Sequence, residues 1–267
     1  MMRSLWSGAT GMGAQQIQTD VTANNLANTS TTGFKKSRAH FEDLMYRTIK
    51  IAGQTTPGGG QVPTGIQIGM GVKPSGVKKV FTQGDYVETG NQLDFAIQGQ
   101  GFFRVTHGDT DMYTRAGDFT LDSDGFITTP GGDRLQPEIS IPIEGTVITL
   151  ESDGTLTVFG TGDEILQTDN VLVTTFVNPA GLFAVGQNLF HETEGSGGPL
   201  EGTPGENGAG TTLNNYLEMS NVSVVEEMVS MIVGQRAYEA NSKTVQTADG
   251  SITCFSLKTY KNRRKSY

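Results

Sequence analysis

The stretch VTANNLANTSTTGFKKS, from Val21 to Ser37, marks an abrupt change in the pattern of the chain. The residues before it follow a helical pattern, and those after it turn to glycine, threonine and alternating apolar residues. The stretch itself is rich in asparagine, threonine and serine and has almost no charge. It therefore predicts the end of a helix and the beginning of a different architecture.

Residues 3–28 are predicted to form a helix with two apolar stripes. Between Arg3 and Lys35 the only charged residue is Asp20. A surface helix normally has one apolar stripe and a charged back, so this pattern indicates either a helix buried across a domain core or a helix packed on several sides by other chains. One stripe holds Leu5, Ala9, Met12, Ala23 and Leu26, and the other holds Trp6, Ala14, Ile17 and Val21.

The C-terminal region, residues 220–252, carries a seven-residue repeat that predicts a coiled-coil seam. Two long helices at opposite ends of the chain, neither with a partner close in sequence, are expected to pack on each other. The repeat consists of Val224, Met231, Tyr238, Val245 and Ile252, and Val225, Met228, Val229 and Ile232 are expected to widen its stripe.

The central region is predicted to be β structure, because apolar and polar residues alternate in 77–87, 94–105, 146–150 and 155–159. DSDG at 122–125, PGGD at 130–133 and ESDG at 151–154 predict tight turns. The segment 192–210 reads as a flexible loop or linker, and 52–65 as an extended stretch. The fold class is thus α+β, with long N- and C-terminal helices pairing as a coiled coil and a central, mainly β domain.

Composition and motifs exclude several function classes. The net charge of −9 over 267 residues argues against a nucleic-acid binder. The single cysteine, Cys254, excludes an internal disulfide framework, and three scattered histidines lack metal-ligand spacing. GQGFFR at 99–104 lacks the third glycine of a dinucleotide site. No enzymatic activity, cofactor or metal is therefore expected, and no apolar run is long enough to span a membrane.

Four segments, in order along the chain, resemble the flagellar basal-body rod and hook family. They are residues 1–37, NQLDFAIQGQGFFRV at 91–105, YTRAGDFTLDSDGFITTPGGDRLQP at 113–137 and residues 220–249. In that family the first helix ends in a pattern N-x-x-A-N-x-x-T-x-G-F/Y-K. The residues that fit this pattern are Asn25, Ala27, Asn28, Thr31, Gly33, Phe34 and Lys35.

The resemblance implies a structural subunit of the bacterial flagellar basal body. In this family the terminal helices pair to form the inner tube of an axial polymer, which encloses an export channel and transmits torque across the periplasm. It implies three regions: a helical axial-tube domain of residues 1–34 and 216–267, an extended linker or arm at 35–75, and a β-rich outer domain at 76–215. The implied partners are further copies of the chain, proximal rod subunits, hook-side axial proteins, the P- and L-ring bushing proteins and the flagellar type III export apparatus.

The N-terminus lacks the apolar core of a secretory signal peptide. Together with the resemblance, this gives the expectation that the chain leaves the cytoplasm through the type III export gate without cleavage. The protein is then expected in the basal body, spanning the periplasm.

The resemblance also implies which residues carry assembly. Gly33 is expected to close the first helix in a left-handed conformation, with Phe34 beside it as an apolar contact, and Asn24 and Asn28 are expected to satisfy exposed backbone carbonyls. Tyr46 to Pro63 lies where rod members carry an arm that the hook protein lacks. The N-terminal assembly residues are Asn24, Asn25, Leu26, Ala27, Asn28, Gly33 and Phe34, and those of the C-terminal helix are Val224, Met228, Met231, Ile232, Gln235, Tyr238, Asn241 and Val245.

The last residues depart from the family pattern. After Asp249 the chain reads GSITCFSLKTYKNRRKSY, with five cations and no acid. Gly250 disfavours a helix interior by about 1 kcal/mol relative to alanine, so the helix is expected to fray past this residue, and Lys258–Tyr267 to make no essential packing contact.

Three alternatives stay open: another rod or hook member, a secreted carbohydrate-binding or hydrolytic protein on a β scaffold, and a coiled-coil adhesin with a β head.

Overall fold

The computed structural model describes residues 2–53, 63–162, 164–206 and 208–263. The chain divides into two compact units. The first contains the chain segments 1–26, 37–78 and 224–267, and the second contains 27–36 and 79–223.

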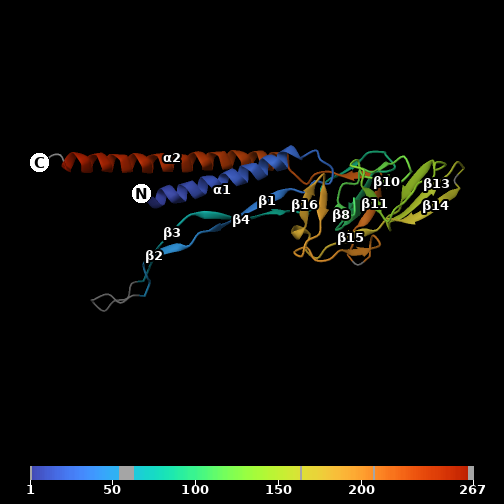
Figure 1. Ribbon diagram of the computed structural model, residues 1–267, viewed down its shortest axis with the longest axis horizontal. Helices are drawn as coiled ribbons and strands as arrows, with labels where there is room; N and C mark the ends of the chain where they lie inside the picture. Colours follow the sequence, from blue (N-terminus) through green and yellow to red (C-terminus); the bar gives the residue numbers. More distant parts are fainter. Residues whose placement is uncertain (1, 54–62, 163, 207, 264–267) are drawn as a thin grey trace. The chain divides into compact units, whose positions relative to one another are not determined.

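The first unit is built on two long helices, α1 (Met2–Ala27) and α2 (Val224–Arg263). They lie side by side in Figure 1. Their contacts show that they run antiparallel: Gly8, near the start of α1, lies against Val245 late in α2, whereas Gly234, early in α2, lies beside Gln15 and Thr19 further along α1. Both predicted helices and their pairing are confirmed. The expected fraying is not seen in the backbone, since α2 continues through Gly250 to Arg263.

The same unit contains two pairs of strands that follow the first helix. β1 (Ser37–Asp43) pairs with β4 (Val72–Lys79), and β2 (Tyr46–Lys50) pairs antiparallel with β3 (Ile66–Gly69). Figure 1 shows β2 and β3 as one narrow ribbon. The segment expected to be an extended arm therefore begins as a strand, and its residues 54–62 lie outside the described residues.

The second unit is a β body of several antiparallel sheets. The nine-stranded sheet has the order β16-β17-β8-β7-β11-β10-β9, with β15 and β18 joined to it through β7. Its strands are β7 (Phe102–His107), β8 (Thr110–Thr114), β9 (Thr120–Leu121), β10 (Ile127–Thr128), β11 (Arg134–Gln136), β15 (Val173–Thr175), β16 (Phe183–Gly186), β17 (Leu189–His191) and β18 (Leu200–Gly202).

The remaining strands form smaller sheets. β12, β13 and β14 make a three-stranded sheet, β19 pairs with β6, and β20 pairs with β5. A short 3₁₀ turn, η1 (Pro179–Gly181), precedes β16. The bounds are β5 (Tyr86–Glu88), β6 (Phe95–Gln98), β12 (Val147–Leu150), β13 (Thr155–Phe159), β14 (Ile165–Asn170), β19 (Thr211–Asn214) and β20 (Tyr216–Glu218).

The core of the β body has two clusters, one on either side of β7. Phe103 and Val105 belong to a large cluster that extends to the three-stranded sheet, whereas Phe102 packs with a smaller, aromatic one. Successive residues of a strand point to opposite faces, so β7 serves both clusters. The aromatic cluster is held by edge-to-face contacts, such as Tyr113 on Phe176 with ring centroids 4.8 Å apart.

The predicted turns are confirmed in the β body. Gly125 N donates to Asp122 O, Gly132 N to Thr129 O and Gly154 N to Glu151 O, and all three glycines have positive φ. The 192–210 segment differs from the expected flexible linker: it contributes β18, and Ser196 within it is fully buried. The low hydrophobicity of this segment did not predict its ordered structure, because backbone hydrogen bonds hold it in place.

Candidate assembly interface

The contact between α1 and α2 depends on small residues. A Cβ added to Gly8 would lie 2.8 Å from Cγ2 of Val245, and one added to Gly11 would lie 2.9 Å from Nδ2 of Asn241. Atoms this close must shift, so a larger residue at either position would push the helices apart. The glycines allow the two backbones to approach closely.

The seam on α2 has an apolar half and a small or polar half. Met231 and Val245 of the predicted repeat are half-buried in it. Three small or polar residues of α2, Gly234, Asn241 and Ala248, are also spaced by seven, and Gly234 and Ala248 are buried. Sequence reasoning missed two of these three positions because it searched for apolar residues, although the same spacing marks them.

A second apolar surface on α2 is exposed. Val225, Met228, Val229 and Ile232 were expected to widen the seam, which is wrong for these four side chains: each is at least half exposed within its unit. We call this surface the α2 stripe. Its members, with their exposed fractions, are Val225 (72%), Met228 (50%), Val229 (55%), Ile232 (57%) and Val233 (61%).

A groove lies beside the helix seam. It is lined by Gln16, Thr19 and Asp20 of α1 and by Gln235, Tyr238 and Glu239 of α2. Tyr238 is 46% exposed, so its ring forms an apolar patch between amide and carboxylate groups. Gln235 and Tyr238, both predicted assembly residues, are thus accessible in this groove, whereas Val224 lies at the first residue of α2.

The asparagines at the end of α1 lie in different environments. Asn25 is buried, and its side chain makes two hydrogen bonds to the backbone of Ser37: Nδ2 donates to the Ser37 carbonyl and Oδ1 accepts from the Ser37 N–H, both at 2.9 Å. Asn25 therefore holds the start of β1 against α1. Asn28 Oδ1 accepts from the hydroxyl of Thr31. Leu26 is half-buried, and Asn24 and Ala27 are exposed.

Gly33 has the expected left-handed conformation, with φ of 66°, but it does not close the helix. α1 ends at Ala27, six residues earlier, and Gly33 instead lies against the backbone of Arg115 and Ala116 in the β body. A Cβ at this position would lie 2.5 Å from Ala116 N. The glycine is required by close approach as well as by its φ.

Phe34 is buried in the β body beneath a lysine. Lys79 Nζ lies 5.0 Å from the centroid of the Phe34 ring and 5.6 Å from that of Phe190, in the range of cation–π attraction. Burial lowers the pKa of Lys79. The apolar contact expected of Phe34 is thus made with the β body rather than with the end of a helix.

A buried ion cluster lies near Phe34. Lys35 Nζ bonds to Glu218 Oε1, and Arg115 Nε bonds at 2.8 Å to Glu218 Oε2. Lys35 also donates to the carbonyl of Thr82. The side chains of Lys35 and Glu218 are each 1% exposed. Desolvation lowers the pKa of Lys35, and the Glu218 carboxylate acts in the opposite direction.

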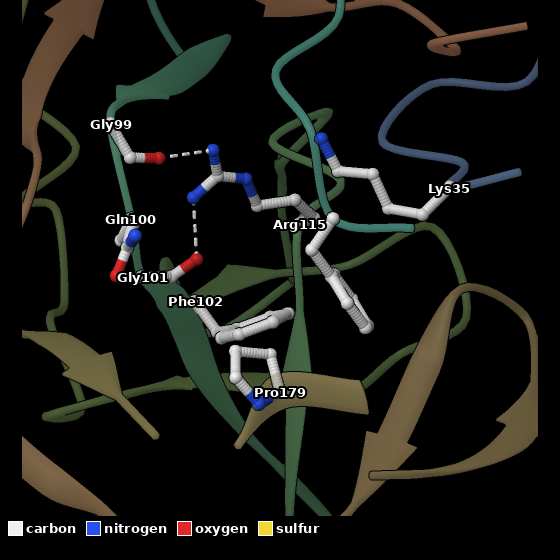
Figure 2. Close-up of a pocket in the computed structure, with 8 residues that line it drawn as sticks. Lys35, Gly99, Gln100, Gly101, Phe102, Arg115 and Pro179 are labelled. Atoms are coloured by element: carbon white, nitrogen blue, oxygen red, sulfur yellow. Dashed lines mark hydrogen bonds between the residues drawn. The ribbon is translucent and has the colours of Figure 1, made fainter. Parts of the chain in front are cut away.

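Lys35 and Arg115 of the cluster also line a small cavity of ≈ 70 Å³. Figure 2 shows the Arg115 guanidinium directed at the carbonyl oxygens of Gly99 and Gly101, with Phe102 and Pro179 below Gly101 in this view. Arg115 donates to both carbonyls, at 2.6 and 2.5 Å, and also to Gln83 Oε1. Its donors are thus engaged by this chain, and the cavity is part of the packing of the β body.

The described residues contain no group of histidine, cysteine or carboxylate side chains that could hold a metal ion. Neither described helix is both long and apolar enough to cross a membrane. Three exposed surfaces, the α2 stripe, the groove beside the helix seam and the β2–β3 ribbon, suit contact with other protein chains.

Comparison with known proteins matches three parts of the chain to family models. Residues 5–35 match the flagella basal body rod protein family, 96–158 match the flagellar hook protein FlgE/F/G D1 domain, and 213–252 match the flagellar basal body rod FlgEFG protein C-terminal domain.

Relatives of known name extend the match to nearly the full chain. The flagellar basal-body rod protein FlgG of Buchnera aphidicola subsp. Acyrthosiphon pisum is 47% identical over 93% of this chain and 96% of its own length. This chain belongs to the FlgG family of flagellar basal-body rod proteins. The FlgG protein of Borreliella burgdorferi is 45% identical over 94% of this chain.

Membership of the FlgG family confirms the sequence-based resemblance and identifies the chain as a structural rod subunit. Among the alternatives, the hook protein FlgE of Helicobacter mustelae is 44% identical over only 49% of this chain and 30% of its own length. FlgG relatives cover both helices and the β body, so the rod assignment replaces the hook, carbohydrate-binding, hydrolytic and adhesin alternatives.

Proposed function

We propose that this chain polymerises into the distal rod of the flagellar basal body, where it transmits torque across the periplasm and encloses the export channel. The proposal rests on FlgG family membership and on one structural observation, the α2 stripe. A helix pair that leaves a second apolar surface uncovered requires a partner to bury it.

The energetic case for a partner follows from the size of the stripe. Fully burying one large apolar side chain contributes about 1.5–3 kcal/mol, and five such side chains are at least half exposed on α2. Part of that free energy offsets the cost of association. Contacts between unlike surfaces of identical copies give helical filaments where the rotation from copy to copy does not close a ring, as a rod requires.

The regions of the chain have separate roles in this proposal. Residues 1–34 and 216–267 form the axial tube, 76–215 form the outer domain, and 35–75 form an arm that braces neighbouring copies. The ribbon supports the last role, because β2 is exposed along its whole length. The partners are other copies, proximal rod subunits, hook-side axial proteins, the P- and L-ring bushing proteins and the type III export apparatus.

Export without cleavage fits the packing of α1. Asn25 holds β1, and Gly8 and Gly11 lie directly against α2. Removal of this segment after export would leave the seam of α2 without its partner. We therefore propose that α1 leaves the cytoplasm with the rest of the chain through the type III export gate and stays in the mature, periplasm-spanning subunit.

A polymerisation assay tests the proposal. Purified protein is concentrated, and filaments are scored by sedimentation and electron microscopy. The parent protein is expected to form filaments above a critical concentration, and Ile232→Lys together with Val229→Lys is expected to abolish them. Ser230→Lys, exposed on the same turn of α2, is the matched control and should leave filaments intact. Absence of filaments in the parent, or their survival in the double variant, contradicts the proposal.

A further inference from the structure

One edge of the β body is open to pairing. β16 is the terminal strand of the nine-stranded sheet: β17 covers one of its edges, and no strand among the described residues covers the other. A strand edge presents a row of backbone donors and acceptors that another chain can extend. β16 carries no charge and no proline, the usual protections of such an edge, although a bulge interrupts its register with β17.

The surroundings of this edge are apolar and acidic. Phe183 is 63% exposed and Val185 is 52% exposed. Phe183, the first residue of β16, pairs with His191, the last residue of β17. The exposed Glu192 follows His191 in sequence and therefore lies near the start of β16. Thr193 donates a hydrogen bond to the carbonyl of Gly181, just before β16, and this contact keeps Glu192 and the exposed Glu194 near the start of the strand.

The β2–β3 ribbon has the opposite charge and the same need for a partner. A two-stranded ribbon alone is marginally stable in water, and every residue of β2 is exposed. In the register of the ribbon, Arg47 lies opposite Ile68 and Lys50 opposite Ile66. Cross-strand partners share a face, so one face of the ribbon combines two cations with two isoleucines. The charged residues of 44–53 and 63–69 are Arg47 and Lys50 alone.

We propose that β2 of one copy adds to the free edge of β16 in a second copy. Backbone hydrogen bonds extend the nine-stranded sheet, the exposed side chains of β2 lie beside Phe183 and Val185, and Arg47 and Lys50 approach Glu192 and Glu194. A ribbon that meets an edge is a contact between unlike surfaces, and such a contact can repeat from copy to copy along a polymer. The inference deepens the proposed function and rests on it, because the second copy is the neighbouring subunit of the rod.

Cross-linking between two single-cysteine proteins tests the contact. Cys254→Ser removes the only cysteine; Thr48→Cys on β2 is then placed in one protein and Ala184→Cys on β16 in a second that carries a size tag. The two are mixed under polymerising conditions and treated with a short thiol–thiol cross-linker. Only a contact between copies gives the mixed dimer, which we expect as the dominant product. Replacing Ala184→Cys by Glu164→Cys, exposed beside the three-stranded sheet, should reduce it at least tenfold.

A charge substitution provides the second measurement. Phe183→Lys places a cation where Arg47 and Lys50 must approach, and it should abolish the mixed dimer without changing the melting temperature of the β body, since this side chain is largely exposed. Ile143→Lys, at a fully exposed site on the same body, is the control and should retain the dimer.

The outcomes separate the two proposals. Filaments of the Cys254→Ser proteins without the mixed dimer, or with equal yield from Glu164→Cys, overturn the edge contact and leave the rod proposal standing. A mixed dimer that persists in Phe183→Lys also overturns it. Absence of filaments in the Cys254→Ser protein itself contradicts the rod proposal and the edge contact together.

Discussion

Lys35 Nζ lies 2.5 Å from Oε1 of Glu218, although 183 residues separate the two in sequence. Lys35 follows the polar stretch after α1, and Glu218 ends β20, six residues before α2 begins. The pair therefore ties together the two chain segments through which the β body connects to the terminal helices. Arg115 completes the cluster from within the body by binding the second oxygen of Glu218.

Glu218→Gln should destabilise the β body more than Lys35→Met. The glutamine leaves two buried cations without their counter-charge, which costs about 3–5 kcal/mol. Lys35→Met leaves Glu218 paired with Arg115 and removes a cation whose desolvation already lowers its pKa, so a cost of about 1–3 kcal/mol is expected. Urea unfolding followed by circular dichroism measures both.

The double variant separates charge balance from packing in this cluster. Adding Lys35→Met to Glu218→Gln removes one of the two unpaired cations, so the double variant should be more stable than the sum of the single effects implies. Strict additivity would show that Lys35 and Glu218 are not energetically coupled.

Gly33→Ala should destabilise the β body by about 2–4 kcal/mol, because alanine adds left-handed strain and overlaps the backbone of Arg115 and Ala116. Gly108→Ala is the matched control: φ is 62° there, close to the 66° of Gly33, and a Cβ would meet no atom within 4 Å. It should cost about 1–2 kcal/mol. Thermal melts compare the two variants, and equal losses would show that close approach at Gly33 is unimportant.

Asp118→Asn should stabilise the β body at neutral pH. Burial raises the pKa of Asp118, and Asp94 raises it further, while hydrogen bonds from its own backbone and Thr32 act in the opposite direction. The native state thus binds a proton more tightly than the unfolded chain, and this group's contribution to stability falls as pH rises through the raised pKa. The advantage of asparagine should shrink as pH falls and vanish below about pH 4, the ordinary value.

Asp153→Asn is the control, because the pKa of Asp153 is shifted in the opposite direction from that of Asp118. The backbone N–H of Thr155 donates to Asp153 and lowers the pKa of this carboxyl, so its stabilisation is present above its ordinary pKa and is lost as pH falls. Its asparagine variant should be less stable than the parent at neutral pH and approach it in acid. Melting temperatures measured from neutral to acid pH test both variants, and parallel curves for Asp118→Asn and the parent would contradict the assignment.

Gly11→Leu should separate α1 from α2, since even a Cβ at this position meets the Asn241 side chain at 2.9 Å. Gly13→Ala, in the same helix with no atom within 4 Å of its added Cβ, should instead stabilise α1 by about 0.5–1 kcal/mol through helix propensity. Amide exchange of the 2–27 segment distinguishes them: faster exchange is expected in the first and slower exchange in the second. Unchanged exchange in Gly11→Leu would show that this contact does not hold the helices together.

Local pattern was enough to predict much of the architecture. The seven-residue spacing of Val224, Met231, Tyr238 and Val245 predicted a long helix with a seam, and Asp-Gly pairs predicted the turns that end at Gly125 and Gly154. These features depend on neighbours within a few residues. The same is true of the uncharged first helix, whose pattern, with the motif from Asn25 to Lys35, led to the rod and hook family.

The tertiary structure alone decided which residues of each sequence pattern are buried and which residues they contact. Val229 and Ile232 look like seam residues by composition but are exposed, while Gly234 and Ala248 are buried. Gly33 was read as a helix cap and proved to be a point of contact with the backbone of Ala116. The ion cluster of Lys35, Arg115 and Glu218 has no local signature at all. Burial and charge pairing depend on residues far apart in the chain, and only folding brings them within the few ångströms over which packing and hydrogen bonding act.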